Sequence, residues 1–277
     1  MSPQTFTSSM ASITSLNVVL RNILEEELAH ESDLLPVEHC KILLLSENSS
    51  SFLSTETGKY PRYPLYMEIS KKLYEWMEND DFPVKSEACG LLTEGDFVAK
   101  RKEIAEKVSP ILAALKKTWR EITDTEKSLQ LMSIIRILGP RGLLDLLNIR
   151  RTQGSVDILP PSIATLLESF NEKHKPTANL TVGARALSKH CHRDLTSEWW
   201  GACAGSEQVK NEHANAVVMR ILGDASWINI HMLPHDLKVI EVRCAEGYGA
   251  RWSYDGKVFR GFLEPQMEDG HAAGWKH

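Results

Sequence analysis

Long hydrophobic runs are absent from this chain of 277 residues, and its apolar stretches, such as residues 42–45, are far too short to span a bilayer. Residues 1–16 are rich in Ser and Thr and lack the basic start and apolar core of a secretory signal peptide. These absences exclude a membrane as a partner. They also make the cytoplasm the expected compartment, with the nucleus as the alternative.

Cysteine is also scarce, and the five cysteines have no CxxC spacing. An odd number of scattered thiols is typical of a reduced intracellular protein and excludes a disulfide scaffold. We therefore expect free thiols at all five positions, which are Cys40, Cys89, Cys191, Cys203 and Cys244.

Neither sign of charge dominates, since 32 Lys and Arg residues face 37 Asp and Glu residues and the net charge is −5. Domains that hold nucleic acid are usually strongly basic. From residue 180 onward the chain carries 11 basic and 12 acidic residues, so any positive field is local. This balance favours a small anionic molecule as partner and makes duplex nucleic acid unexpected. A single strand stacked on Trp199, Trp200 or Trp227 is the alternative.

Familiar nucleotide and protease motifs are missing, including the P-loop, HExxH, the kinase set and GxSxG. Gly247-Tyr248-Gly249 has no third glycine and precedes a strand, so it is no dinucleotide fingerprint. The cofactor is therefore unknown at this stage, and the sequence names no reaction.

What the chain does have, up to about residue 178, is helical periodicity. Apolar spacing predicts helices over residues 16–28, 66–77 and 104–122, the last with a kink or restart at Pro110. Thr123 and Glu126 have the spacing of a capping box that opens another helix. Within this region only residues 40–45 resemble a strand. We expect residues 1–178 to be a mostly helical scaffold whose surface could bind a protein partner.

Beyond residue 178 the sequence pattern changes from helical spacing to a mixture of helix and strand. Residues 206–222 predict a helix, and four strand-like runs follow, at 227–232, 239–244, 248–254 and 257–263. Asp255-Gly256 between the last two is a strong signal for a two-residue hairpin turn. The prediction is an α+β protein: a mainly helical N-terminal part packed on a C-terminal domain, residues 179–277, with an antiparallel four-strand meander and one or two helices.

The hairpin also predicts a register, with Trp252 opposite Phe259 and Arg251 opposite Arg260. Facing arginines are destabilising unless an anion neutralises them. Alternation along the strands places seven polar or aromatic residues on one sheet face: Trp227, Asn229, His231, Glu241, Arg243, Arg251 and Arg260.

This face suggests a site for a ligand that bears phosphate or carboxylate. Arg243, Arg251 and Arg260 would clamp the anion, because guanidinium groups bind such oxygens in pairs. His231 would act as acid, base or donor, Trp227 would form a wall, and Asn229 and Glu241 would complete the ligand contacts. In the alternative, acids such as Glu241, Glu246 and Glu264 satisfy the arginines, and the chain is a non-enzymatic interaction or scaffold protein.

A second alternative is a cysteine-nucleophile hydrolase. Residues 201–205, Gly-Ala-Cys-Ala-Gly, have the shape of a nucleophile elbow with Cys203 ahead of a helix. The base would be His213, His231 or His235, and Asp236 or Glu241 would orient it.

No metal site is expected from the sequence. Residues 190–194, His-Cys-His-Arg-Asp, resemble the H-x-H-x-D part of the metallo-β-lactamase motif, but position 195 is Leu where that motif continues with His. His190 and His192 diverge if the segment is helical. These two residues and Asp194 are the candidates if a metal binds at all.

Overall fold

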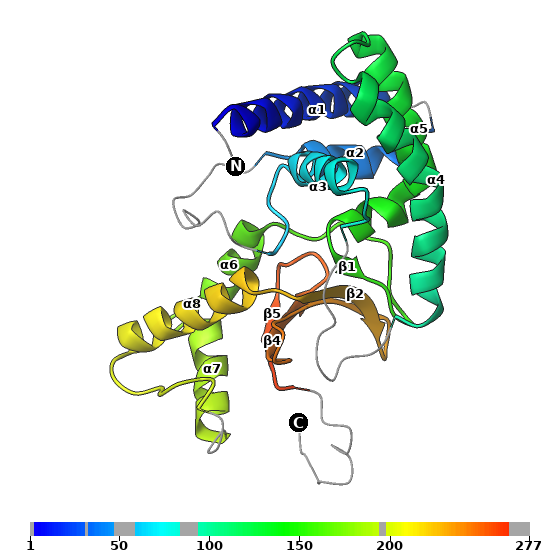
Figure 1. Cartoon of the computed structure of the whole chain (residues 1–277). Helices are drawn as coiled ribbons and strands as arrows, with labels where there is room; N and C mark the ends of the chain where they lie inside the picture. Colours follow the sequence, from blue (N-terminus) through cyan, green and yellow to red (C-terminus); the bar gives the residue numbers. More distant parts are fainter. Residues whose placement is uncertain (1–2, 31–32, 47–58, 84–93, 194–197, 266–277) are drawn as a thin grey trace.

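The computed structural model describes residues 3–30, 33–46, 59–83, 94–193 and 198–265, with side chains from residue 13 onward and that of Arg193 excepted. The predicted α+β class is confirmed: helices dominate the N-terminal part, and a sheet lies in the C-terminal part (Figure 1). The helices within these ranges are α1 (Pro3–His30), α2 (Val37–Leu44), α3 (Leu65–Asn79), α4 (Asp96–Thr118), α5 (Asp124–Leu146), α6 (Ile163–Asn171), α7 (Val182–Arg193) and α8 (Glu207–Gly223). The strands are β1 (Ile149–Arg150), β2 (Trp227–Leu233), β3 (Leu237–Arg243), β4 (Gly249–Ser253) and β5 (Phe259–Leu263).

Helices α1 to α5 bury the apolar stripes that the periodicity predicts. Leu20 of α1, Leu73 of α3 and Leu112 of α4 are all at most 2% exposed. The capping box of α5 is confirmed, since the Thr123 side chain accepts from the Glu126 backbone N–H and the Glu126 carboxylate accepts from the Thr123 N–H.

One local prediction in this part is wrong. Residues 40–45 are not a strand, because Cys40 and Leu43 lie on the buried face of α2. An apolar run this short fits either structure by periodicity alone. Helix α4 runs through Pro110 without a restart, and within α5 the backbone leaves helical geometry at Gly139, whose φ is 58°.

The sheet has the order β1-β2-β3-β4-β5. Strands β2 to β5 form the predicted antiparallel meander. Strand β1, which the sequence pattern does not predict, adds a short parallel edge by pairing Ile149 with Ile228. A strand of two residues is too short to leave a periodic pattern.

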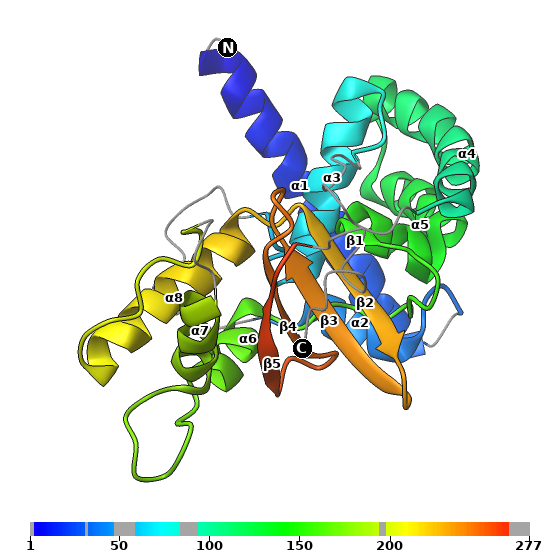
Figure 2. The same cartoon turned by 90° about the horizontal axis from the view of Figure 1, so that it is seen from below.

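One face of the sheet packs on the C-terminal helices (Figure 2). The indole N–H of Trp252 donates to the Leu166 carbonyl of α6 at 3.1 Å, and the rings of Phe170 and Phe259 meet edge to face at 4.9 Å. Ile230 and Ile240 are fully buried on the same side. The opposite face carries Asn229, His231, Glu241, Arg243 and Arg251, and it is called the polar sheet face below.

A β-bulge changes the predicted register of the last hairpin. Trp252 does pair with Phe259, but Arg251 pairs with Gly261 and not with Arg260. The extra residue sits next to Gly261, whose φ of 137° is open to glycine and strained for other residues. The facing arginine pair that the sequence predicted therefore does not exist.

Hydrogen bonds join the segment ahead of α3 to the segment ahead of α6 and to the C-terminal part. The Tyr60 hydroxyl donates to the Pro161 carbonyl and the Tyr63 hydroxyl to the Pro160 carbonyl, each at 2.7 Å. The Lys59 N–H donates to the carbonyl of Gly223 at the end of α8. Among the helices described, none combines the length and the apolar character that crossing a membrane requires.

Gly183 tests the packing of α7 against α6, because a Cβ at this position would lie 2.2 Å from Cζ of Phe170 in α6. We expect Gly183→Ala to lower the free energy of unfolding by about 1–3 kcal/mol through overpacking. Gly223→Ala is the matched control, since a Cβ at that position meets nothing within 4 Å. The free energy of unfolding of both variants is measured by urea denaturation. Equal values for the two variants would contradict the close packing of α7 on α6.

Candidate active site on the polar sheet face

Glu241 of β3 is the centre of the polar sheet face and is 3% exposed. Its Oε1 accepts from Nε of Arg251 at 2.8 Å and lies 2.6 Å from Nη2 of the same guanidinium. Its Oε2 accepts from Nε of Arg243 at 3.3 Å. Two arginines thus share one buried carboxylate, and the antiparallel register that places Arg251 opposite Glu241 fixes this arrangement.

The charge on Glu241 is strongly favoured. Burial alone raises the pKa of this carboxyl group, but the contact with His231 and the positive charges of Arg243 and Arg251 outweigh it and lower the pKa to about 2. Glu241 is therefore a carboxylate at every physiological pH.

His231 of β2 lies diagonally across from Glu241, with Nε2 3.2 Å from Oε1. The ring is close enough for an ion pair when protonated, yet among the described residues Nε2 has no well-aligned hydrogen-bond acceptor. The side chains of His231 and Arg251 are 18% and 30% exposed, against 4% for Glu241. His231 and Arg251 are thus the two members of this group that a ligand can reach.

Asn229 and Arg243 are buried anchors. The Asn229 Oδ1 accepts from the Ser155 hydroxyl at 2.7 Å and its Nδ2 donates to Thr152 Oγ1 at 2.8 Å, which fixes the loop after β1 beside β2. Nη1 of Arg243 donates to the Gly247 carbonyl at 2.7 Å and to a second carbonyl at 2.9 Å. Trp227, also predicted as a ligand contact, is only 6% exposed and pairs with Arg243 across the strands.

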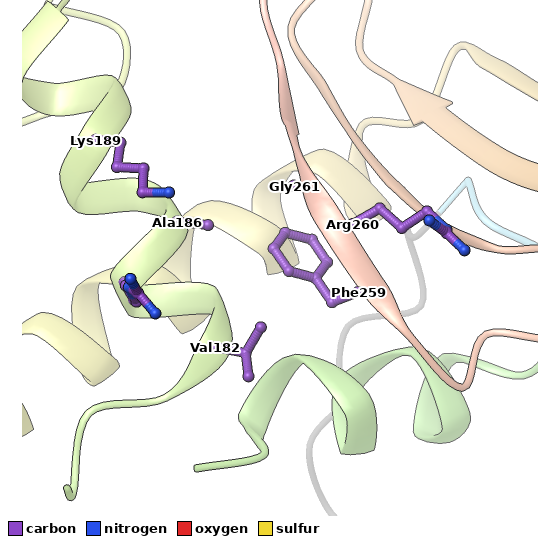
Figure 3. Close-up of a pocket in the computed structure, with 7 residues that line it drawn as sticks. Val182, Ala186, Lys189, Phe259, Arg260 and Gly261 are labelled. Atoms are coloured by element: carbon purple, nitrogen blue, oxygen red, sulfur yellow. The ribbon is translucent and has the colours of Figure 1, made fainter. Parts of the chain in front are cut away.

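Arg260 lies apart from this group, exposed on the edge strand β5. It borders a hollow of about 220 Å³ between β5 and α7 (Figure 3). Lys189 points from α7 toward β5, while Arg260 points to the other side of the strand. Arg185 also lines the hollow, and all its charged lining residues are basic.

Cys203 is not a free nucleophile, because a disulfide joins it to Cys191. The expectation of five free thiols is therefore wrong for this pair, whereas Cys40 and Cys244 are free and buried, and Cys89 lies outside the described residues. Of the alternative bases proposed for Cys203, His213 has a ring nitrogen within 4.8 Å of its sulfur. His235 forms the exposed β2–β3 turn with Asp236, across the sheet from α7 and α8 (Figure 2).

The metal candidates do not converge. His190 and His192 lie on α7, where His190 Nδ1 is 2.7 Å from Oε1 of Glu264 and His192 is exposed. Asp194 lies outside the described residues. The Glu264 carboxylate also accepts from the indole N–H of Trp200 at 2.9 Å, while the Glu264 backbone carbonyl accepts from Nη1 of Arg243 at 2.9 Å.

Four residues that contribute to the site were missed by the sequence reasoning. Ser155 and Thr152 sit in a loop whose position depends on the unforeseen strand β1. Arg185 and Lys189 are four residues apart on the exposed side of α7, and that spacing could have revealed a basic helix face.

Comparison with family models gives a match to part of the chain. Residues 170–264, about a third of the chain, match the family model of a CdiA C-terminal tRNase toxin domain. No curated protein and no solved structure matches this chain. The matched segment begins in α6 and ends after β5, so it contains α7, α8 and the whole meander.

This match overturns three expectations drawn from the sequence. A small anionic ligand and a Cys203 hydrolase are both wrong as functions, because the matched family is one of tRNases. The low expectation for nucleic acid as a partner is wrong for the same reason. Net charge misled the argument: the matched segment carries 12 Lys and Arg residues against 11 Asp and Glu, whereas the whole chain has a charge of −5.

The buried carboxylate predicts a specific dependence of stability on pH. The folded pKa of Glu241 lies near 2, below its ordinary value of 4.5, so its stabilising effect is complete above pH 4.5 and is lost as pH falls toward 2. Glu241→Gln should cost on the order of 3 kcal/mol at pH 7, because it leaves the buried guanidinium of Arg243 and the partly exposed one of Arg251 without their carboxylate. The difference in unfolding free energy between the wild type and Glu241→Gln should disappear as pH falls from 4.5 to 2. A difference that does not change with pH would contradict the lowered pKa of Glu241.

Proposed function

We propose that the C-terminal part of this chain is a ribonuclease that cleaves tRNA, with its active site on the polar sheet face. The match to a CdiA C-terminal tRNase toxin domain over residues 170–264 carries the proposal. The group of His231, Glu241 and Arg251 supports it, because this group contains the chemical functions that RNA cleavage requires.

RNA carries its own nucleophile, the ribose 2′-hydroxyl beside each phosphodiester. In the proposed reaction, His231 removes the proton from this hydroxyl, and the 2′-oxygen bonds to the adjacent phosphorus. The bond between phosphorus and the 5′-oxygen breaks, and that oxygen leaves with a proton from solvent. The products are a 2′,3′-cyclic phosphate and a 5′-hydroxyl.

Glu241 and Arg251 have different tasks in this scheme. Glu241 orients the imidazole of His231, because its fixed carboxylate lies 3.2 Å from Nε2 of that ring. Arg251 is part exposed and offers N–H donors to the phosphate, whose negative charge grows in the transition state. Arg243 and Asn229 position these groups without touching the RNA.

The basic residues around β5 would guide the RNA backbone to this group. Lys189 of α7 lies on one side of the edge strand and the Arg260 side chain on the other, and Arg185 of α7 lines the same hollow. Gly261, next to Arg260, pairs with Arg251. A strand of RNA that crosses β5 would therefore meet positive charge along its path, although the chain as a whole is acidic.

The helical part, residues 1–178, would serve as a scaffold for this unit. Helix α6 is an exception, since Phe170 and Leu166 contact the sheet directly and the family match begins at residue 170. The functional boundary in this proposal lies ahead of α6.

Substitution of His231 tests the catalytic assignment. We expect His231→Ala to reduce single-turnover cleavage of purified tRNA by about 10²–10⁴-fold, the usual contribution of a general acid or base, and to leave tRNA binding within about twofold. His192→Ala is the matched control, because this histidine is exposed at the end of α7. Cleavage is read on denaturing gels, and binding by filter retention.

The possible outcomes separate the two parts of the proposal. A folded wild-type chain that leaves tRNA intact would refute the ribonuclease function. Full activity in His231→Ala would retain the function but refute the active site.

Removing the basic pair on α7 tests the path of the RNA. Arg185→Ala combined with Lys189→Ala should weaken tRNA binding about tenfold and reduce the salt dependence of log K by about 1.5, since two phosphate contacts are lost. The double variant Lys102→Ala with Lys117→Ala removes the same charge from exposed positions on α4. Equal weakening in both double variants would mean that only overall charge matters.

A further inference from the structure

The disulfide between Cys191 and Cys203 has a third potential ligand beside it. A ring nitrogen of His213 and the two sulfurs all lie within 4.8 Å of one another. The three residues come from separate elements: Cys191 from α7, Cys203 from the loop before α8, and His213 from α8 itself. They are distinct from the polar sheet face and from the histidines that the sequence suggested as metal ligands.

The ring of His213 is already held in a fixed orientation. Its Nε2 lies 2.7 Å from the carbonyl oxygen of Trp200. A carbonyl only accepts, so Nε2 carries the proton and Nδ1 has the free lone pair. Zinc-binding histidines are oriented in this way, by an N–H bond from one nitrogen to a carbonyl while the other nitrogen binds the metal.

The backbone leaves room for this ring. Gly201 has a φ of 68°, and a Cβ at that position would lie 2.9 Å from Cε1 of His213. Only glycine fits a position with both features without strain. The loop thus forms a cradle in which the imidazole sits beside both sulfurs.

We propose that Cys191, Cys203 and His213 bind one zinc ion when the protein is reduced. Two thiolates and one imidazole form a typical zinc set, with a water molecule or a further side chain as fourth ligand. Reduction must come first: a dithiol reductant supplies two electrons and two protons, which convert the disulfide to two thiols, and the reductant is oxidised to its own disulfide. Zinc then displaces one proton from each thiol.

Disulfide and zinc would be two alternative ways to fasten the same loop. This loop carries Trp199, which stacks on Tyr248 at 4.3 Å, and Trp200, whose indole N–H reaches Glu264. Either fastening keeps these aromatic rings against the sheet, so the fold would persist in oxidising and in reducing surroundings. The proposal concerns a structural site and does not depend on RNA cleavage.

Metal analysis of the full chain tests the proposal. The protein is kept in a dithiol reductant, loaded with zinc, desalted and analysed by mass spectrometry of the metal. We expect about one zinc ion per wild-type chain and less than about a fifth of that in Cys203→Ser and in His213→Ala. Cys244→Ser should keep its zinc, because the Cys244 thiol is buried elsewhere and burial raises its pKa to about 11.

Cobalt titration of the reduced wild-type chain gives an answer even if a variant fails to fold. Tetrahedral Co²⁺ bound to thiolates produces intense sulfur-to-cobalt absorption in the near ultraviolet, and this band should saturate at about one equivalent. A reduced wild-type chain that shows no such band and retains no zinc would overturn the proposal. Undiminished zinc in a folded His213→Ala would overturn the role of the histidine and reduce the site to a disulfide pair.

Discussion

The arrangement of the polar sheet face depends on one buried carboxylate. Glu241 holds Arg243 beneath it, Arg251 across from it and His231 beside it, and without its charge two guanidiniums would lie uncompensated in the sheet. Because the three contacts come from three neighbouring strands, the register of the meander and the electrostatics of the face are mutually dependent. Within the described group of Asn229, His231, Glu241, Arg243 and Arg251, the two members that a substrate can reach are His231 and Arg251.

This division between accessible and buried members separates catalytic from structural roles. Arg243 and Asn229 use their polar groups to secure backbone segments, and they are almost fully enclosed. The residues proposed to meet RNA are instead partly exposed, and basic side chains of α7 and β5 lie on the two sides of the edge strand. A neutral or acidic average charge is compatible with nucleic-acid binding when the positive groups are concentrated in this way.

Much of the fold could be predicted from the sequence, because its signals were local. The Thr123–Glu126 capping box, the helix before residue 223 and the Asp255-Gly256 turn each depend on a few neighbouring residues, and all are present. Alternation also placed Glu241, His231 and Arg251 on one face. Three of the failures concern how two elements meet, which the pattern within one element does not report: the bulge at Arg260, the parallel strand β1 and the disulfide. At residues 40–45 the apolar run was too short to distinguish a strand from a helix. The net charge failed to predict a nucleic-acid partner, because it averages over the whole chain. It could not reveal the basic residues gathered around the edge strand β5 of an acidic chain.

The chemical identity of the cleaved RNA ends tests the account most directly. The full chain is incubated with tRNA, and the fragments are analysed by mass spectrometry. Acid–base catalysis by His231 with the ribose 2′-hydroxyl as nucleophile predicts fragments that end in 2′,3′-cyclic phosphate and begin with 5′-hydroxyl. It also predicts that a 2′-deoxy substitution at the cleavage site blocks the reaction. Fragments with 3′-hydroxyl and 5′-phosphate ends, or cleavage that ignores the 2′-deoxy substitution, would contradict the account.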